Sequence, residues 1–447
     1  MQRRTFLSLL ALPAVAHLLQ SCGDDSTQGG TGTTPGSAPT PTTSPGSGLR
    51  NTLRGTAAHV TEGADPTDAA AAVNAFANDL YARLVATDPL ANLVFSPASI
   101  AVALAMTSTG AKGATLQEMD AVLHITDPAA IHRSMNGLMM GMEALNQSQD
   151  NTAEGGTGTS EVQLNIANSL WGQNGLAFEQ AFLDLLSAEY DAGLELVDYA
   201  NDPDGARGAI NEWVATETKD RIPQLLAPGS ISGDTRLTLV NAIYLKANWA
   251  DVFDGDATKD EPFAAPAGEV TVQMMHRTSQ FGYAEGEGWQ AVDVPYVFGG
   301  LSFTVAVGDT ADAVLPTGDE VFAGLSSRKV ALGFPKFDIE TSTDLASVLG
   351  DMGMATAFTA DADFSGMTAD ERLTIGGVIH QANITVDEQG TEAAAATAVV
   401  MVATAAPVEQ DPVVLTIDRP FTFWLRDRAT DTIVFMGRVT DPSSTRT

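Results

Sequence analysis

Residues Val386–Val402 have the sequence VDEQGTEAAAATAVVMV, a run without proline or aromatic residues near the end of a long chain. Its alanine-rich part is compatible with a buried helix. The β-branched pair Val399–Val400 favours a strand instead, and Gly390 would start a helix at its most flexible point. With a period of two, Glu392 lies on one face, and the other is small and uncharged. That second face consists of Thr391, Ala393, Ala395, Thr397, Val399 and Met401. We therefore expect a strand that can enter the middle of a sheet.

The composition indicates a folded, strongly acidic protein. The chain has 447 residues, of which 44% are hydrophobic, and this is enough to bury a core. Lys and Arg total 23 against 56 for Asp and Glu, which gives a formal net charge of -33. A charge of this size repels phosphate backbones and anionic lipid surfaces. It argues against nucleic acid as a partner and is typical of a well-solvated surface.

The first 21 residues have the features of an export signal. Arg3 and Arg4 precede an apolar run from Phe6 to Leu19, which is too short to span a bilayer comfortably. The segment around the two arginines resembles the twin-arginine export motif. Leu19-Gln20-Ser21-Cys22 resembles a bacterial lipobox, in which the cysteine after the cleavage point carries lipid. We expect a signal peptide over residues 1–21 and a lipid on Cys22.

Lipid on Cys22 would hold an exported protein at the bacterial cell envelope, in the periplasm or on the cell surface; an extracellular location also stays open. Gly23 stands where an Asp often marks inner-membrane retention in Gram-negative bacteria, which favours the outer membrane. Cys22 is the only cysteine, so no disulfide can form within the chain.

A low-complexity stretch separates this signal from the folded part. Residues 26–48 contain only Ser, Thr, Gln, Gly, Pro and Ala, which cannot bury enough apolar surface to become ordered. We expect a lipidated, disordered linker over residues 22–57 that tethers one large folded domain, residues 58–447.

The folded part mixes helix and strand patterns. Apolar residues at helical spacing are Val73, Phe76, Leu80 and Leu84. Ser96 followed by Pro97 predicts the start of a second helix. Strands are predicted at Val330–Phe334, Phe421–Leu425 and Thr432–Met436, the last two facing each other across a polar turn. The pattern indicates an α+β class.

No residue constellation predicts an enzyme or a metal protein. H-E-x-x-H, the Walker A loop and G-x-S-x-G are all missing. Ser326–Lys329 fits S-x-x-K, but without the companion motifs of that class it is explained by chance. Asp254–Asp260 resembles the start of a calcium loop, yet Lys259 replaces the turn glycine. We expect no metal and no cofactor.

Six stretches resemble, in chain order, motifs of the serpins, a family of serine protease inhibitors. They are Asn92–Ile100, Leu239–Trp249, Phe334–Phe337, Asp363–Gly366, Val378–Ala382 and Asp418–Phe421. Val386–Val402 is similar to the reactive-loop hinge of inhibitory serpins. The whole resemblance runs from about Ala72 to Pro442. Thr422 departs from it, because the family usually has a larger apolar residue there.

The resemblance implies a serpin fold with three β-sheets, eight to nine helices and an exposed reactive-centre loop. It also implies a mechanism: a protease acylates the loop, and the freed hinge inserts as a new strand and drags the attached enzyme along. A bulky or charged residue would stall a strand that enters between two paired strands. The implied hinge residues are Glu388, Gly390, Thr391, Glu392, Ala393, Ala394, Ala395, Ala396 and Thr397.

Supporting residues carry over by position. Lys336 and Glu388 match a pair where the loop joins the sheet, and Trp249 matches the opening above it. A polar cluster beneath the opening strands would contain Ser96, Ser99, Asn241 and His380, in which a neutral His accepts one hydrogen bond and donates another. Without the resemblance, surface pairing and ordinary core packing explain the same residues.

The family's spacing places the scissile bond at Thr404–Ala405, although Met401–Val402 and Glu409–Gln410 stay open because the stretch to Pro420 is longer than usual. Small residues there suit elastase-like or subtilisin-like serine proteases, with cysteine proteases also open. We expect a monomer that inhibits a protease through a covalent acyl complex and is not an enzyme. The alternative is a non-inhibitory serpin-fold binding protein, which would be cleaved as a substrate.

Overall fold

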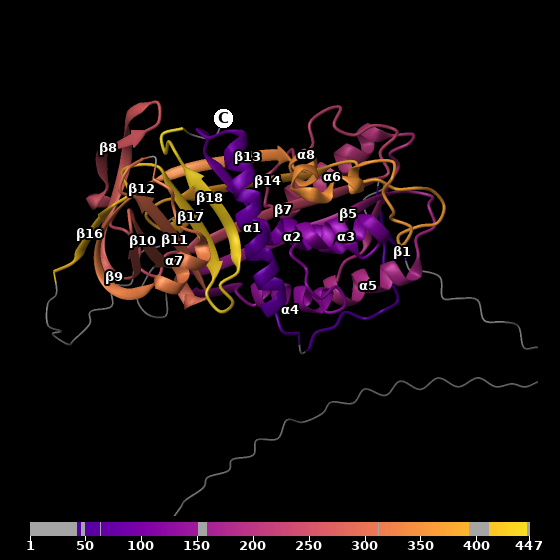
Figure 1. Cartoon of the computed structure of the whole chain (residues 1–447), viewed down its shortest axis with the longest axis horizontal. Helices are drawn as coiled ribbons and strands as arrows, with labels where there is room; N and C mark the ends of the chain where they lie inside the picture. Colours follow the sequence, from indigo (N-terminus) through magenta and orange to yellow (C-terminus); the bar gives the residue numbers. More distant parts are fainter. Residues whose placement is uncertain are drawn as a thin grey trace, which may run out of the picture. The chain divides into compact units, whose positions relative to one another are not determined.

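The structure, a computed structural model, describes residues 43–45, 50–62, 64–150, 159–311, 313–392 and 411–444. The α-helices within these residues are α1 (Thr67–Thr87), α2 (Pro97–Ser108), α3 (Gly113–Val122), α4 (Ile131–Glu143), α5 (Gln180–Tyr190), α6 (Pro203–Glu217), α7 (Gly318–Gly324) and α8 (Ala346–Leu349). Short 3-10 or π-helical turns are η2 (Gly255–Ala257), η3 (Val297–Gly299), η4 (Gly350–Met354) and η5 (Thr356–Phe358). Figure 1 shows α1 crossing the molecule beside α2.

The first sheet is built around a long buried strand. In spatial order its strands are β1 (Thr43–Pro45), β2 (Asn51–Leu53), β6 (Leu194–Val197), β5 (Thr159–Gln173), β7 (Leu237–Asn248), β15 (Gly390–Thr391), β14 (Val378–Val386) and β13 (Phe337–Asp344), with β4 (Gln147–Asp150) beside β5. Strand β7 is buried along almost its whole length, because helices cover the sheet on both faces.

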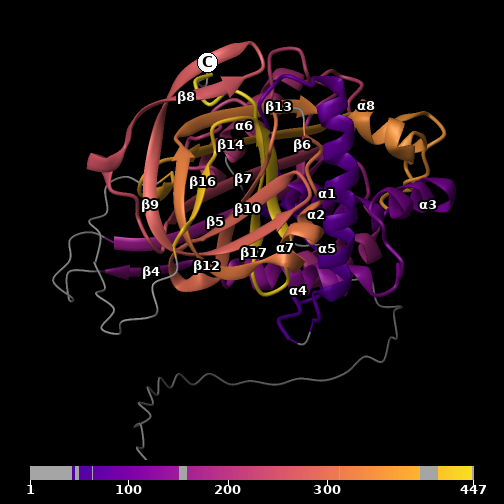
Figure 2. The same cartoon turned by 60° about the vertical axis from the view of Figure 1, so that its left-hand side comes forward.

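The second sheet contains most of the remaining strands. In order they are β16 (Val413–Thr416), β12 (Ser326–Pro335), β9 (Gly268–Gly286), β10 (Trp289–Pro295), β11 (Leu301–Gly308), β17 (Phe421–Asp427), β18 (Ile433–Val439) and β3 (Leu93–Phe95), with β8 (Lys259–Ala265) beside β9. Hydrogen bonds run without a break through the long strand β9. Two of the three expected sheets are therefore continuous with each other (Figure 2).

The elements predicted from local patterns are present. Val73, Phe76 and Leu80 are completely buried on α1. Ser96 caps α2, its hydroxyl accepting a hydrogen bond from the N–H of Ser99. Strands β12 and β17 cover the predicted ranges, β18 begins at Ile433, one residue after the predicted start, and β17 pairs antiparallel with β18. These predictions are confirmed, and the α+β class with them.

Helix α6 covers the outer face of the first sheet. A small apolar core of its own lies between the helix and strands β5 and β7, with Trp171, Tyr199, Ile210, Val214 and Val240 completely buried. The larger core lies on the opposite face of these strands, against α2 and the second sheet. Alternate residues of β7 thus face two different environments, which matters for any strand placed beside it.

The ordered part of the chain begins before residue 58. Residues Asn51–Leu53, which composition placed in the linker, pair antiparallel with β6 as strand β2. The backbone N–H groups of Thr56 and Ala57 then donate to Oδ1 of Asp184 on α5, at 2.6 and 3.1 Å. A polar segment can be ordered in this way because partners elsewhere in the chain satisfy its backbone groups.

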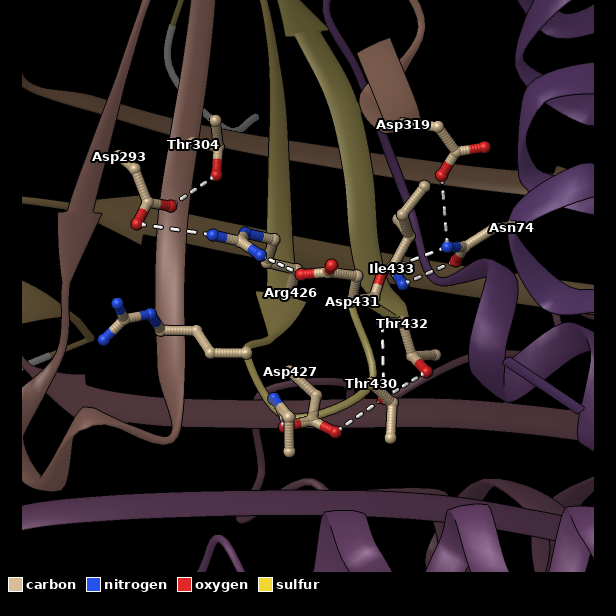
Figure 3. A network of polar contacts seen from close by, with 12 residues as sticks. Asn74, Asp293, Thr304, Asp319, Arg426, Asp427, Thr430, Asp431, Thr432 and Ile433 are labelled. Atoms are coloured by element: carbon tan, nitrogen blue, oxygen red, sulfur yellow. Dashed lines mark hydrogen bonds and ion pairs between the residues drawn. The ribbon is translucent and has the colours of Figure 1, made fainter. Parts of the chain in front are cut away.

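A buried polar network ties the second sheet to α1 and α7 (Figure 3). Arg426 of β17 is only 7% exposed, and its guanidinium lies 3.6 Å from Asp293 of β10 and also pairs with Asp431. Asp293 accepts a further hydrogen bond from Thr304, at 2.6 Å. Asn74 of α1 donates to the carbonyl of Asp431 at 3.0 Å. Because the charges are paired and hydrogen-bonded, burial of Arg426 is tolerated.

Candidate functional site at the split end of the first sheet

The first sheet is split at one end. Strands β7 and β14 are parallel neighbours, and they pair directly at Leu239–Ala242 and Val378–Gln381. Beyond that stretch the two-residue strand β15 lies between them and pairs antiparallel with both. Thr391 stands opposite Ala247 of β7 and Val386 of β14. The sheet thus holds the first residues of the segment that was predicted to enter it.

Gly390 permits this close approach. Its φ is 152°, and a Cβ atom here would lie 2.0 Å from the carbonyl oxygen of Ala247. Any side chain would therefore collide with the backbone of β7. Asp387 shapes the turn before it, since its Oδ1 accepts the N–H groups of Gln389 at 2.8 Å and Gly390 at 3.2 Å. Burial raises the pKa of Asp387, and these hydrogen bonds oppose the shift.

Thr391 is anchored beneath the opening. It is 1% exposed, and its hydroxyl lies 2.5 Å from that of Tyr296. The Tyr296 ring stacks on Trp249 with ring centroids 4.5 Å apart, and burial raises the pKa of Tyr296 well above its usual value. The Trp249 indole N–H donates to the carbonyl of Asp387 at 2.9 Å. Trp249 therefore lies at the opening, where the resemblance placed it.

Glu388 is paired at the point where the chain leaves β14. Lys336 Nζ lies 2.7 Å from its Oε2, and the Thr258 hydroxyl donates to Oε1 at 2.9 Å. Burial alone would raise the pKa of Glu388. The hydrogen bonds that its carboxylate accepts from Lys336, from its own backbone N–H and from Thr258 outweigh this effect, so the pKa is lowered. The structure thus brings together Glu388 and Lys336, the pair predicted from the resemblance.

Glu392 directly follows β15. Its N–H donates to the carbonyl of Thr385 at 3.1 Å, but its φ is 52°, in the left-handed region. Its carboxylate forms an ion pair with Arg221, which follows α6. The hinge is therefore seated as far as Thr391 and turns away at Glu392.

The four polar residues predicted beneath the opening strands form one chain of hydrogen bonds. His380 accepts the N–H of Ser96 at Nε2, at 3.1 Å, and donates from Nδ1 to Asn241 Oδ1, at 2.5 Å. Burial lowers the pKa of His380 to about 3, so the ring is neutral near pH 7. Asn241 and Ser99 both donate to Oδ1 of Asn168 on β5, at 2.8 and 2.9 Å. The cluster therefore links β14, β7, β5 and α2.

Sequence reasoning missed several members of this site: Asn168, Arg221, Thr258, Tyr296 and Asp387. An Asp before a turn glycine is a recognisable local signal, and Asp387 could have been found in this way. The others are distant in sequence from the hinge, and no local pattern marks them.

Several predicted residues lie outside the described part of the chain. They are the signal peptide, Cys22, Ala393–Ala396, Thr397, the proposed bond Thr404–Ala405 and the alternatives Met401–Val402 and Glu409–Gln410. Within the described ranges, no cluster of three or more His, Cys, Asp or Glu could hold a metal ion. No helix in those ranges is long and apolar enough to cross a membrane.

Comparisons with known proteins match this geometry. The family model described as "Serpin (serine protease inhibitor)" matches residues 71–442. An uncharacterized serpin-like protein of Thermococcus kodakarensis is 37% identical over 379 residues, covering 83% of this chain and 85% of that protein. The leukocyte elastase inhibitor of Xenopus tropicalis is 34% identical, covering 82% and 97%.

The fold agrees as well. The crystal structure of a thermophilic serpin, tengpin, in its native state superposes with a TM-score of 0.74 at 26% identity, covering 86% of this chain and 97% of tengpin. The family match spans nearly the whole described domain, and the second sheet and the split beside β15 lie within it. The chain therefore belongs to the serpin family.

Proposed function

We propose that this serpin is a suicide inhibitor of serine endopeptidases that traps the acyl-enzyme by inserting its cleaved loop between β7 and β14. The observation that carries the proposal is β15: Gly390 and Thr391 pair with β7, and Thr391 also pairs with β14, at the end where the two strands separate. A strand that has begun between two partners can lengthen by adding one residue at a time to both ladders.

The register of β15 gives the position of each later residue. Continued from Thr391, the strand would place Thr397 opposite both Asn241 and His380. The register between β7 and β14 is the same where they pair directly (Asn241 with His380) and where Thr391 lies between them (Ala247 and Val386). One inserted strand can therefore pair with both strands without a shift in register. The stretch Gly390–Met401 would match the 12 residues of β7, a length of roughly 40 Å at about 3.3 Å per residue. A protease attached at Thr404 would be carried that far.

Insertion must break the direct hydrogen bond between His380 and Asn241, and Thr397 would replace it. Residues opposite each other on neighbouring strands point to the same face, so the Thr397 hydroxyl would enter between the two side chains. A hydroxyl can accept from His380 Nδ1 and donate to Asn241 Oδ1. The single polar residue in the run Ala393–Ala398 would thus stand where a buried donor and acceptor need a partner.

The chemistry follows from a displaced acyl-enzyme. The protease serine Oγ attacks the carbonyl carbon of residue 404, an ester forms, and the amine of residue 405 leaves with a proton from the protease histidine. Hydrolysis of that ester needs the oxyanion hole and an aligned triad. Loss of one oxyanion donor slows the step about 100- to 1000-fold, so a protease deformed against the sheet stays attached.

The target class is proposed from the sequence around Thr404. Small side chains suit elastase-like or subtilisin-like pockets, and relatives named leukocyte elastase inhibitor support this choice. No Lys or Arg lies between Glu388 and Asp418, which disfavours trypsin-like enzymes.

The test mixes the mature chain, from residue 22 with Cys22→Ser, with pancreatic-type elastase, subtilisin and trypsin. A denaturation-resistant adduct with elastase or subtilisin, with release of a peptide that begins at Ala405, would establish the mechanism and the bond. Cleavage without an adduct, with the protease still active, would leave the serpin fold as a binding protein that is cut as a substrate. Trypsin is the matched control, since it is expected to form no adduct.

We also propose export and lipid attachment at Cys22, supported by the basic, apolar and Leu-Gln-Ser-Cys segments of residues 1–22. Metabolic labelling with palmitate followed by membrane fractionation tests this proposal. The parent should be labelled and sediment with membranes, and Cys22→Ala should lose both properties.

A further inference from the structure

Glu392 directly follows Thr391, the last residue of strand β15. Thr391 is paired on both sides, whereas Glu392 donates its N–H to Thr385 and turns through a left-handed conformation. Its carboxylate, 17% exposed, is paired with the guanidinium of Arg221. This ion pair is made at the residue that follows β15.

An unusual turn places Arg221 at this point. Lys219 and Asp220, which follow α6, both have left-handed φ values of 53° and 61°. The completely buried Thr218 stabilises this turn through two hydrogen bonds. Its carbonyl accepts the N–H of Arg221 at 3.0 Å, and its hydroxyl accepts the N–H of Ile222 at 3.1 Å. Non-glycine residues rarely adopt consecutive left-handed conformations, and such strain gathers at functional positions.

The register assigns Glu392 a different partner after insertion. If the strand continues from Thr391, Glu392 lies opposite Lys246 of β7 and points to the α6 face, which Val240 and Ala242 also line. Lys246 is paired with Glu161 of β5. Cross-strand neighbours have Cβ atoms about 5 Å apart, within reach of a Lys–Glu pair. A carboxylate on this face is therefore compatible with insertion.

Tyr244 of β7 is a further titratable group close to Glu392 on the α6 face of the first sheet. The pKa of Tyr244 is raised to about 12, chiefly by burial and then by the charge of Glu392, with a smaller contribution from Glu161, while Arg221 opposes the shift. Arg221, Glu392, Glu161, Lys246 and Tyr244 thus form one cluster on the α6 face of β5 and β7.

We propose that Arg221 is a positioning residue that holds the uncleaved loop inserted to Thr391 and no further, and that Glu392 exchanges Arg221 for Lys246 when the cleaved loop enters the sheet. Only the second step, in which Glu392 exchanges Arg221 for Lys246, rests on the proposed insertion mechanism. Glu392 would be paired at both ends of the reaction, so the one charged residue of the inserting hinge is never left without a cation.

Hydrogen exchange of residues 387–392 tests both steps in one assay, on the mature chain from residue 22 with Cys22→Ser. In the uncleaved protein, Arg221→Gln should exchange roughly 1.5- to 5-fold faster than the parent, the range expected from a partly exposed ion pair. Lys246→Gln should leave the rate unchanged there. In protein cleaved by a protease that it does not trap, the order should reverse: Lys246→Gln exchanges faster and Arg221→Gln does not.

Arg83→Gln, at an exposed position of α1, is the matched control, and Arg221→Lys and Lys246→Arg should restore the parent rates. Unchanged exchange in uncleaved Arg221→Gln would overturn the first step, and unchanged exchange in cleaved Lys246→Gln would overturn the second. If cleavage gives no new protection over residues 393–401, the insertion mechanism itself has failed, and the uncleaved arm still decides the role of Arg221.

Discussion

His380 Nδ1 donates a 2.5 Å hydrogen bond to Oδ1 of Asn241, and this bond joins the two strands that a new strand would have to separate. His380 is completely buried and accepts the N–H of Ser96 on its other nitrogen. The imidazole therefore has no spare hydrogen-bonding group. Any insertion that parts β14 from β7 must supply a replacement donor and acceptor at this level, or leave two buried polar groups unpaired.

Thr397 is expected to supply that replacement. Thr397→Val keeps the shape of the side chain but removes the hydroxyl, so it should destabilise the cleaved, inserted protein by about 1–3 kcal/mol and leave the uncleaved protein unchanged. Guanidinium unfolding of both forms measures the difference. Thr397→Ser should behave like the parent. An equal effect of Thr397→Val on both forms would show that the residue does not reach the His380–Asn241 level.

Acid should weaken the native state through the same histidine. The folded pKa of His380 is about 3, against 6.5 for an ordinary histidine, so below pH 6.5 the unfolded chain binds a proton that the native state excludes. The free energy of unfolding should thus fall as the pH drops from 6.5 towards 3, by up to about 1.4 kcal/mol per pH unit.

His132 adds a term of the same sign, because burial, partly offset by Glu189, lowers its pKa to about 4. Denaturant titrations at pH 7, 6, 5 and 4.5 measure how the free energy of unfolding changes with pH. His380→Gln and His132→Gln should each give a shallower slope than the parent, corresponding to about one proton fewer taken up on unfolding. Equal slopes for the parent and His380→Gln would mean that His380 is not excluded from protonation in the native state.

A large charged side chain at Thr391 should convert the inhibitor into a substrate. Thr391 is 1% exposed between β7 and β14 and bonded to Tyr296, so an arginine there cannot be seated without burying an unpaired charge. Thr391→Arg should remain folded, because the hinge can leave the sheet. It should raise the number of serpin molecules consumed per protease inactivated at least tenfold, whereas Thr391→Ser should match the parent. Unimpaired inhibition by Thr391→Arg would show that this position does not need to enter the sheet.

The sequence predicted local features better than distant ones. The β17–β18 hairpin and the Ser96 cap were found because their partners lie close in the chain. The composition of Val386–Val402 predicted what could enter a sheet. It could not predict that Glu392 pairs with Arg221, because Arg221 lies 171 positions away in the chain.

Residues of the site that were predicted came from the family resemblance. It pointed to Lys336 and Glu388, but Thr258, the second partner of Glu388, is 130 positions away and carries no recognisable motif. The linker boundary was placed too late for a different reason. Composition describes the cost of ordering a polar segment, whereas the ordering of Thr56 and Ala57 comes from Asp184 on α5.

The last prediction concerns the buried arginine of the second sheet. Removing Asp293 would leave the 7%-exposed Arg426 with Asp431, drawn in Figure 3, and with the ring of Phe322 as its remaining partners. Asp293→Ala should lower the free energy of unfolding by about 3–5 kcal/mol, because the buried guanidinium loses its buried counter-ion and keeps only the half-exposed Asp431.

The double variant Asp293→Leu/Arg426→Met removes both charges and should recover most of that loss. Asp204→Ala, which breaks an exposed pair with Arg207 on α6, is the control and should change stability by less than about 1 kcal/mol. Guanidinium unfolding of the uncleaved chain measures all three. If the double variant is no more stable than Asp293→Ala, neither the unpaired charge nor the missing volume explains the cost. The loss would then lie in the hydrogen bonds of the network, such as that from Thr304 to Asp293, which neither variant retains.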